Sequence, residues 1–108
     1  MIPVMQTKFG DPEGNCLMAC VASILEVPLE SCPNLNAAGE MWWKTFEAFL
    51  VEKGFTPICL SPVHTPKAPA GYAIANGPST RGLEHSVVVL DGELIHDPHP
   101  DGNGIQSI

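Results

Sequence analysis

Hydrophobic residues recur at helical spacing in two early segments of the chain. Leu17, Cys20, Val21 and Ile24 follow an i, i+3, i+4, i+7 pattern, which predicts a helix from Asn15 to about Glu26 that ends before a proline. A second apolar run predicts a helix over residues 38–53, with a glycine as its stop signal. The apolar face of that second helix would hold Trp42, Trp43, Phe46, Phe49 and Leu50 as core residues.

The second half of the chain has the pattern of short strands. Residues 55–60 and 72–76 have strand-like composition, and residues 83–90, with three consecutive valines, form the clearest strand. Asp91-Gly92 favours a hairpin that returns along residues 93–97, and the rest of the chain reads as a loosely held tail. Helices followed by an antiparallel sheet of three to five strands predict one α+β domain over residues 1–108.

Composition narrows the classes of function. A chain of 108 residues with 44% hydrophobic residues is long enough for one modest core. The net charge of −7 argues against binding to nucleic acid or to an anionic membrane surface. No apolar run reaches membrane-spanning length and no basic segment precedes an apolar one at the start, so we expect no signal peptide, a cytoplasmic location and reduced cysteines.

The turn-rich segment before the first helix places a cysteine in a special position. Asn15 is a good N-cap residue, whose side-chain oxygen can accept from free N–H groups of the first turn. Cys16 would then be the first helical residue, where the positive end of the helix dipole favours a thiolate. The alternative is that Cys16 is a small buried hydrophobic residue.

Two later residues complete a possible site with Cys16. If the hairpin loop has three residues, 90–92, then His85 lies directly opposite Asp97, with Cβ atoms about 5 Å apart on one face. A two-residue turn would place them on opposite faces. In the first register Cys16 attacks a carbonyl carbon, His85 exchanges the proton and Asp97 orients His85. The oxyanion would be held by the Cys16 N–H and by Gln6, with Asn15 as the second choice of side-chain donor.

These residues, in this order, are similar to the papain-like cysteine peptidase superfamily. The resemblance is carried by Asn15-Cys16, Glu84-His85-Ser86 and His96-Asp97-Pro98, and its nearest members are small bacterial and phage-type peptidases and those that mature bacteriocins. It implies a papain-like fold with N-terminal helices packed on a small antiparallel sheet. It also implies a cofactor-free thiol hydrolase or acyl transferase acting on a peptide or protein substrate. Hydrolysis, acyl transfer and deamidation all use the same three residues.

Two alternatives stay open at this point. Cys16, Cys20, His85, His96, Asp97 and His99 have side chains that zinc can bind, although no CxxC or HExxH element is present. A catalytically silent protein-binding module on the same fold would also fit a small acidic chain. Arg81 is a candidate to bind an acidic group of a substrate, whereas His96 should face away from Asp97 and His99 is assigned no role.

Overall fold

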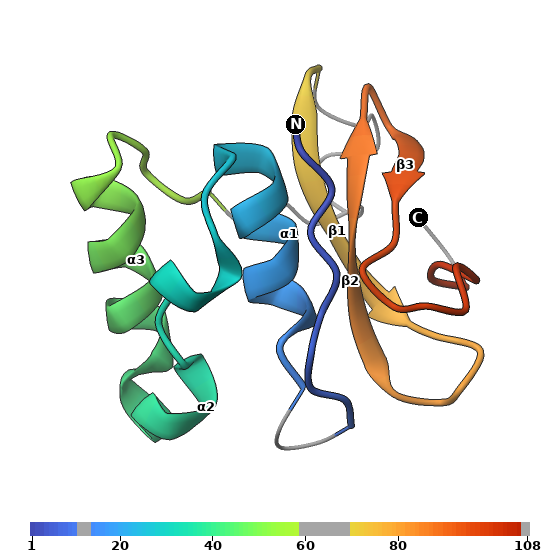
Figure 1. The fold of residues 1–108 in the computed structure, drawn as a ribbon, viewed down its shortest axis with the longest axis horizontal. Helices are drawn as coiled ribbons and strands as arrows, with labels where there is room; N and C mark the ends of the chain where they lie inside the picture. Colours follow the sequence, from blue (N-terminus) through green and yellow to red (C-terminus); the bar gives the residue numbers. More distant parts are fainter. Residues whose placement is uncertain (11–13, 59–69, 107–108) are drawn as a thin grey trace.

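The computed structural model describes residues 1–10, 14–58 and 70–106 and has an α+β architecture (Figure 1). A helical half precedes three antiparallel strands, and the strand order in the sheet is β1-β2-β3. The helical elements are α1 (Cys16–Leu25), η1 (Leu29–Ser31), α2 (Leu35–Ala38), η2 (Gly39–Met41) and α3 (Trp42–Glu52). The strands are β1 (Tyr72–Pro78), β2 (Glu84–Leu90) and β3 (Glu93–His96).

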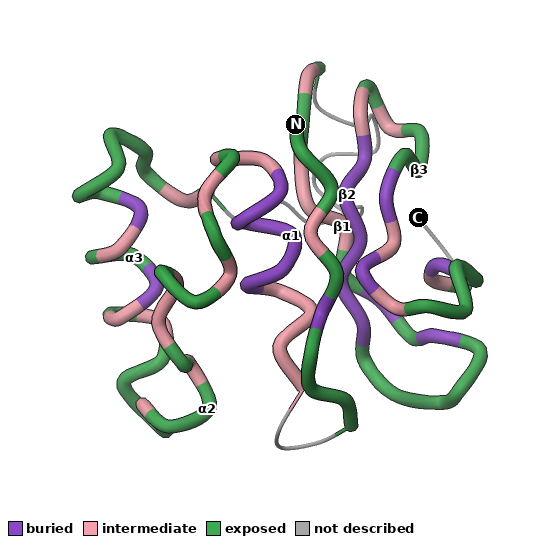
Figure 2. The backbone as a smooth tube through the Cα atoms, in the orientation of Figure 1, coloured by how far each residue is buried: buried purple, intermediate pink, exposed green. Residues whose placement is uncertain are grey.

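Helix α1 is the middle layer of the domain, between α3 and the sheet (Figures 1 and 2). Six consecutive residues of α1, 18–23, are buried, so both faces of the helix are covered. On one face Met18 and Val21 join Phe46 and Leu50 of α3 in the hydrophobic core. Three smaller side chains of α1, Ala19, Cys20 and Ser23, are fully buried, and α1 packs against β2. Small residues allow this close approach to the buried valines of β2.

The N-terminal arm, residues 1–8, lies between α1 and the end of the hairpin (Figure 1). The N–H of Val4 donates to the hydroxyl of Ser23 at 2.9 Å, and that hydroxyl donates to the carbonyl of Ala19 at 2.8 Å. On the other side of the arm, His96 Nε2 donates to the carbonyl of Val4 at 2.8 Å. The arm therefore joins the central helix to β3, and His96 has a structural partner.

The hairpin register differs from the three-residue loop expected above. Leu90 pairs with Glu93 across a two-residue turn, in which Asp91 (φ 52°) and Gly92 (φ 85°) both have left-handed backbone conformations. Val89 pairs with Leu94, but Val88 pairs with His96, so one extra residue of β3 forms a bulge. His85 and Asp97 are therefore not directly opposed, and the predicted register was wrong.

The bulge nevertheless returns His85 and Asp97 to the same face of the sheet. A two-residue turn alone would direct His85 and Asp97 to opposite faces, because side chains alternate along a strand. The extra residue in β3 shifts the alternation by one position. Every residue after it therefore points to the face opposite to the one that unbroken pairing would give. Asp97 directly follows β3 and so turns to the face that carries His85.

Three further expectations are corrected by the structure. The second long helix begins at Trp42 rather than Ala38, because Gly39 (φ 58°, ψ −125°) interrupts the helical path. Trp42 is 43% exposed and is not a core residue. The expected strand over 55–60 is absent at residues 55–58, and residues 59–60 lie outside the described part of the chain.

The C-terminal segment is also more firmly held than a loose tail. The N–H of Gln106 donates to the carbonyl of Pro78 at 2.7 Å, and its side-chain amide donates to the carbonyl of Ser79 at 3.1 Å. Pro98 is fully buried. The described part of this segment thus packs back on the end of β1 and the residue that follows it.

Among the residues described, no single helix is long and apolar enough to cross a membrane. Only α1 taken together with the bent run Leu29–Glu52 passes on length and composition, and the two parts meet at 105°.

We expect Ser23→Ala to lower the free energy of unfolding by about 1–3 kcal/mol, because it leaves the N–H of Val4 without its acceptor in a buried setting. Urea denaturation monitored by circular dichroism measures the change. Ser31→Ala is the matched control, since it removes an exposed hydroxyl bonded to the carbonyl of Pro28. Equal effects of the two substitutions would contradict the role given to the arm.

Candidate active site

Cys16 occupies the first position of α1, as the sequence predicts. Asn15 is at the N-cap but its side chain makes no capping bond. Its Oδ1 accepts instead from the N–H groups of Thr7 and Lys8, both at 3.0 Å. The predicted side-chain cap was therefore wrong, and Asn15 fastens the N-terminal arm to the start of α1.

The helix start consequently keeps a free donor beside the sulfur. The N–H of Cys16 makes no hydrogen bond to any residue that the structure describes. Unpaired N–H groups of a first turn carry partial positive charge and attract anions. This environment suits a thiolate or a developing oxyanion.

Gln6 is held close to this helix start by its own backbone and by its neighbours. Its N–H donates to the carbonyl of Pro98 at 3.0 Å, and its side chain is buried, with 7% of the residue exposed. Its Nε2 donates one hydrogen to the carbonyl of Lys8 at 2.9 Å, which leaves the second amide hydrogen for another acceptor. Its Oε1 is buried and has no partner among the described residues.

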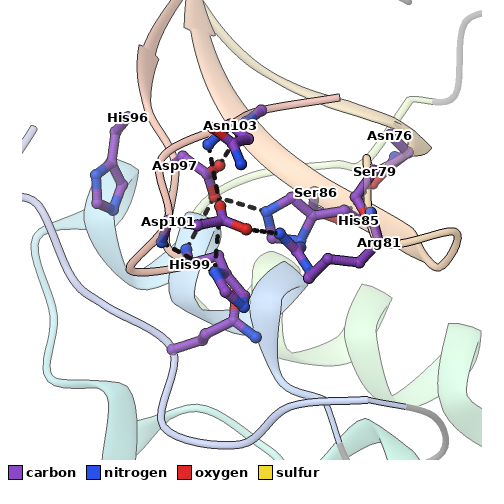
Figure 3. Close-up of polar contacts among 12 residues, drawn as sticks. Asn76, Ser79, Arg81, His85, Ser86, His96, Asp97, His99, Asp101 and Asn103 are labelled. Atoms are coloured by element: carbon purple, nitrogen blue, oxygen red, sulfur yellow. Dashed lines mark hydrogen bonds and ion pairs between the residues drawn. The ribbon is translucent and has the colours of Figure 1, made fainter. Parts of the chain in front are cut away.

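His85 and Asp97 form a buried hydrogen-bonded pair (Figure 3). His85 Nε2 lies 2.6 Å from Asp97 Oδ1, and both side chains are only 3% exposed. Two backbone N–H groups, from His99 at 2.8 Å and Gly104 at 2.7 Å, also donate to the carboxylate. Burial alone would raise the pKa of Asp97, but the hydrogen bonds from His85, His99 and Gly104 outweigh it and hold the pKa below its usual range.

The pairing decides which ring nitrogen of His85 can accept a proton. An ionised Asp97 only accepts hydrogen bonds, so the proton of a neutral His85 ring must lie on Nε2. The other nitrogen, Nδ1, then carries the lone pair and has no hydrogen bond to a described residue. His85 is thus arranged with one nitrogen fixed and the other available.

One cavity of about 590 Å³ has Cys16, His85 and Gln6 in its wall. Asp97 is not part of this wall and supports His85 from outside it. The Cys16 sulfur makes no hydrogen bond to any described residue, and such contacts commonly form only when substrate is bound. Asn15 does not line this cavity, so the structure gives no support to its second-choice role as an oxyanion donor.

Arg81 lines the same cavity but already has an acidic partner. Its guanidinium pairs with the carboxylate of Asp101, and both side chains are about one-quarter exposed. Hydrogen bonds from the Asn103 N–H and from Arg81 hold the pKa of Asp101 below its usual range, although desolvation acts in the opposite direction. An acidic group of a substrate would have to compete with Asp101 for Arg81.

His99, which the sequence left without a role, belongs to the site. Its N–H supports Asp97, and its ring lies edge-on to the rings of His85 and Phe9, at 6.1 and 5.2 Å between centroids. His99 Nδ1 accepts from the N–H of Asp101 at 3.1 Å. Asp97 and Asp101 each form an Asx turn, in which the carboxylate accepts from the backbone N–H two residues later. The donors are the N–H groups of His99 and Asn103. The tendency of aspartate to form such turns is the sequence signal that could have placed His99 beside Asp97.

The zinc alternative gains no support. Within the described ranges, no three His, Cys, Asp or Glu side chains are grouped so that they could hold a metal ion. Cys20 is fully buried, and its burial, with the nearby Cys16 and Asp97, raises its thiol pKa far above the usual range. His96 bonds to the backbone and points away from the pair in Figure 3.

The chain matches no known protein-family model, no curated protein and no solved structure. Its function can therefore be inferred only from the arrangement of its own residues.

The pH dependence of stability tests the state of Asp97. Its pKa is lower in the folded chain than in the unfolded one, where it is about 3.9. The stabilisation is therefore present above that value and is lost as the pH falls through the folded pKa. We expect the free energy of unfolding of the wild type to exceed that of Asp97→Asn near neutral pH, and the excess to shrink below about pH 4 in urea titrations.

Ser86→Ala is the control for that titration, because it removes a buried group that does not ionise. Its effect on the free energy of unfolding should be the same across the series. A difference between wild type and Asp97→Asn that does not change with pH would show that Asp97 is not held as a carboxylate.

Proposed function

We propose that the protein is a thiol-dependent hydrolase or acyl transferase that attacks an amide or peptide bond through Cys16, His85 and Asp97. The observation that carries the proposal is the buried His85–Asp97 hydrogen bond at the wall of a cavity that Cys16 also lines. His85 keeps Nδ1 unbonded to the described residues, and the thiol at the start of α1 lines the same cavity.

The reaction divides among the three residues as follows. The Cys16 thiol transfers its proton to His85 Nδ1, and the thiolate attacks the carbonyl carbon. The imidazolium then donates this proton to the leaving amine as the C–N bond breaks and a thioester forms on Cys16. Water, or another nucleophile in acyl transfer, then attacks the thioester as its proton passes to His85. The C–S bond breaks, the acyl group leaves with the new nucleophile, and His85 returns the proton to the Cys16 sulfur. Asp97 keeps the ring in one orientation and stabilises its charge.

The oxyanion of each tetrahedral intermediate needs donors already in position. The N–H of Cys16, which bonds to no described residue, is one donor, and the second hydrogen of Gln6 Nε2 is the other. The bond from Gln6 Nε2 to the carbonyl of Lys8 fixes which end of the amide is the nitrogen, because a carbonyl accepts only from the NH₂ group. The nitrogen end of the Gln6 amide is therefore known, and its second hydrogen is left for another acceptor.

We also propose that the α+β fold is of the papain-like type. It is supported by the order of parts: a cysteine opening a central helix, a histidine on a strand, and an acid after the next strand. A peptide or protein is the substrate class that this resemblance suggests. A silent binding module on the same fold is the competing reading, and reactivity of Cys16 separates the two.

We expect iodoacetamide to alkylate Cys16 faster than Cys32 near pH 6, where a thiol of ordinary pKa, about 8.5, is almost wholly protonated. Cys32 is a suitable reference because it is also partly exposed and its thiol pKa is not lowered. Burial is the main cause that raises this pKa. His85→Ala should slow alkylation of Cys16 by about tenfold or more and leave Cys32 unchanged. Peptide mass spectrometry after timed quenching measures both rates.

Equal labelling of Cys16 and Cys32, with no effect of His85→Ala, would reject an activated thiol and favour the silent module. The control variant is His96→Ala, a histidine of similar burial whose partner is the carbonyl of Val4. It is expected to lower stability without changing the labelling rate of Cys16 in the folded protein.

Gln6→Ala separates oxyanion binding from thiol activation. Hydrolysis of p-nitrophenyl acetate passes through an oxyanion and should slow by about 10²-fold, as when one oxyanion donor is removed. Alkylation by iodoacetamide forms no oxyanion, so its rate should stay unchanged. Gln106→Ala is the matched control, since that amide also donates to a backbone carbonyl but lies outside the cavity. Parallel loss of both rates in Gln6→Ala would indicate a general structural effect instead.

A further inference from the structure

A second cavity, of about 440 Å³, adjoins the one that holds Cys16. The two cavities share Gly14 and Asn36 in their walls, and Asn36 Nδ2 donates to the carbonyl of Gly14 at 3.0 Å. Asn36 is itself fixed, because its N–H and that of Ala37 both donate to Asn34 Oδ1 at the start of α2. The boundary between the cavities is therefore one hydrogen-bonded bridge.

The lining of this second cavity is mixed, with apolar side chains beside the polar residues Lys8, Asn15, Asn34 and Asn36. Its size is within the range of about 300–1,000 Å³ typical of small-molecule sites. Most of the lining residues belong to the start of α1 and to the segment that contains η1, α2 and η2. The apolar residues in the wall are Leu17, Met18, Leu29, Cys32, Pro33, Leu35 and Trp42.

Trp42 is the least expected member of that wall. The helical pattern predicts a core position, yet the residue is 43% exposed, and its one close aromatic neighbour is Trp43, edge-on at 5.5 Å. Gly39, with its positive φ, changes the chain direction just before α3 and so places Trp42 at the cavity. A large exposed aromatic ring that lines a cavity is a common feature of a binding surface.

We propose that this second cavity is a specificity pocket that receives a large apolar side chain, such as leucine, methionine or phenylalanine, on the substrate residue beside the attacked bond. The proposal rests on the thiol site proposed above. Its support is continuity, since Leu17 directly follows the nucleophile and one bridge separates the two cavities. Burying such a side chain against Trp42 and the leucines would supply binding energy that glycine or aspartate cannot.

The first test measures binding without requiring a reactive thiol. The chain has two tryptophans, so its indole N–H groups give two NMR signals, which Trp43→Phe assigns. In the Cys16→Ser variant, N-acetyl-leucinamide and N-acetyl-phenylalaninamide should shift the Trp42 signal to saturation. The affinity for N-acetylglycinamide and N-acetylaspartamide should be lower by about tenfold or more. No shift of the Trp42 signal, or equal affinity for the glycine ligand, would overturn the proposal.

The second test measures selectivity at Cys16 itself. The rate of alkylation by N-acetyl-leucine chloromethyl ketone, divided by that of the glycine analogue, should be about ten or more in the wild type. Trp42→Ala should reduce the ratio toward one, whereas Trp42→Phe should keep most of it. Tyr72→Ala is the control, because Tyr72 is similarly exposed, at 47%, but lies on β1 outside the cavity. An unchanged ratio in Trp42→Ala would overturn the pocket.

The two proposals fail in distinguishable ways. Selective iodoacetamide labelling of Cys16 with no leucine preference and no Trp42 shift would remove the pocket and leave the thiol enzyme. A saturable, leucine-selective Trp42 shift with an inert Cys16 would remove the enzyme and leave an apolar binding pocket.

Discussion

The structure depends on the burial of both faces of helix α1. Its larger apolar residues meet α3, and its small residues, Ala19, Cys20 and Ser23, allow close packing on β2. Close packing of this kind leaves little freedom to slide or rotate the helix. The first residue of α1, Cys16, is therefore held at a defined position next to the layer formed by the sheet, whose strand β2 carries His85.

The sheet contributes the second half of the candidate site through an irregularity rather than through regular pairing. A two-residue turn is the connection whose twist suits an antiparallel pair, and Asp91-Gly92 forms it with two left-handed residues. The bulge in β3 then reverses the facing and turns Asp97 toward His85. Bulges next to functional sites commonly redirect a side chain in this way.

The ends of the chain complete the arrangement around these two elements. The N-terminal arm is bonded to Ser23, Asn15, His96 and Pro98, and so brings Gln6 to the cavity wall. The segment after β3 returns two N–H groups to Asp97 and adds the ring of His99 beside His85. Hydrogen bonds between segments far apart in the chain thus hold Gln6, His99 and Asp97 around the candidate site.

By itself, the sequence determined the α+β class, the positions of α1 and the three strands, Cys16 at a helix start, and the choice of His85 and Asp97. These follow from local properties: hydrophobic period, capping and turn residues, and the chemistry of side chains. Only the tertiary structure decided the hairpin register, the use of Asn15 as a fastener, the pairing of Arg81 with Asp101, and the exposure of Trp42. Each of these depends on competition among partners far apart in the chain, and a pattern read along the sequence contains no distances between such partners.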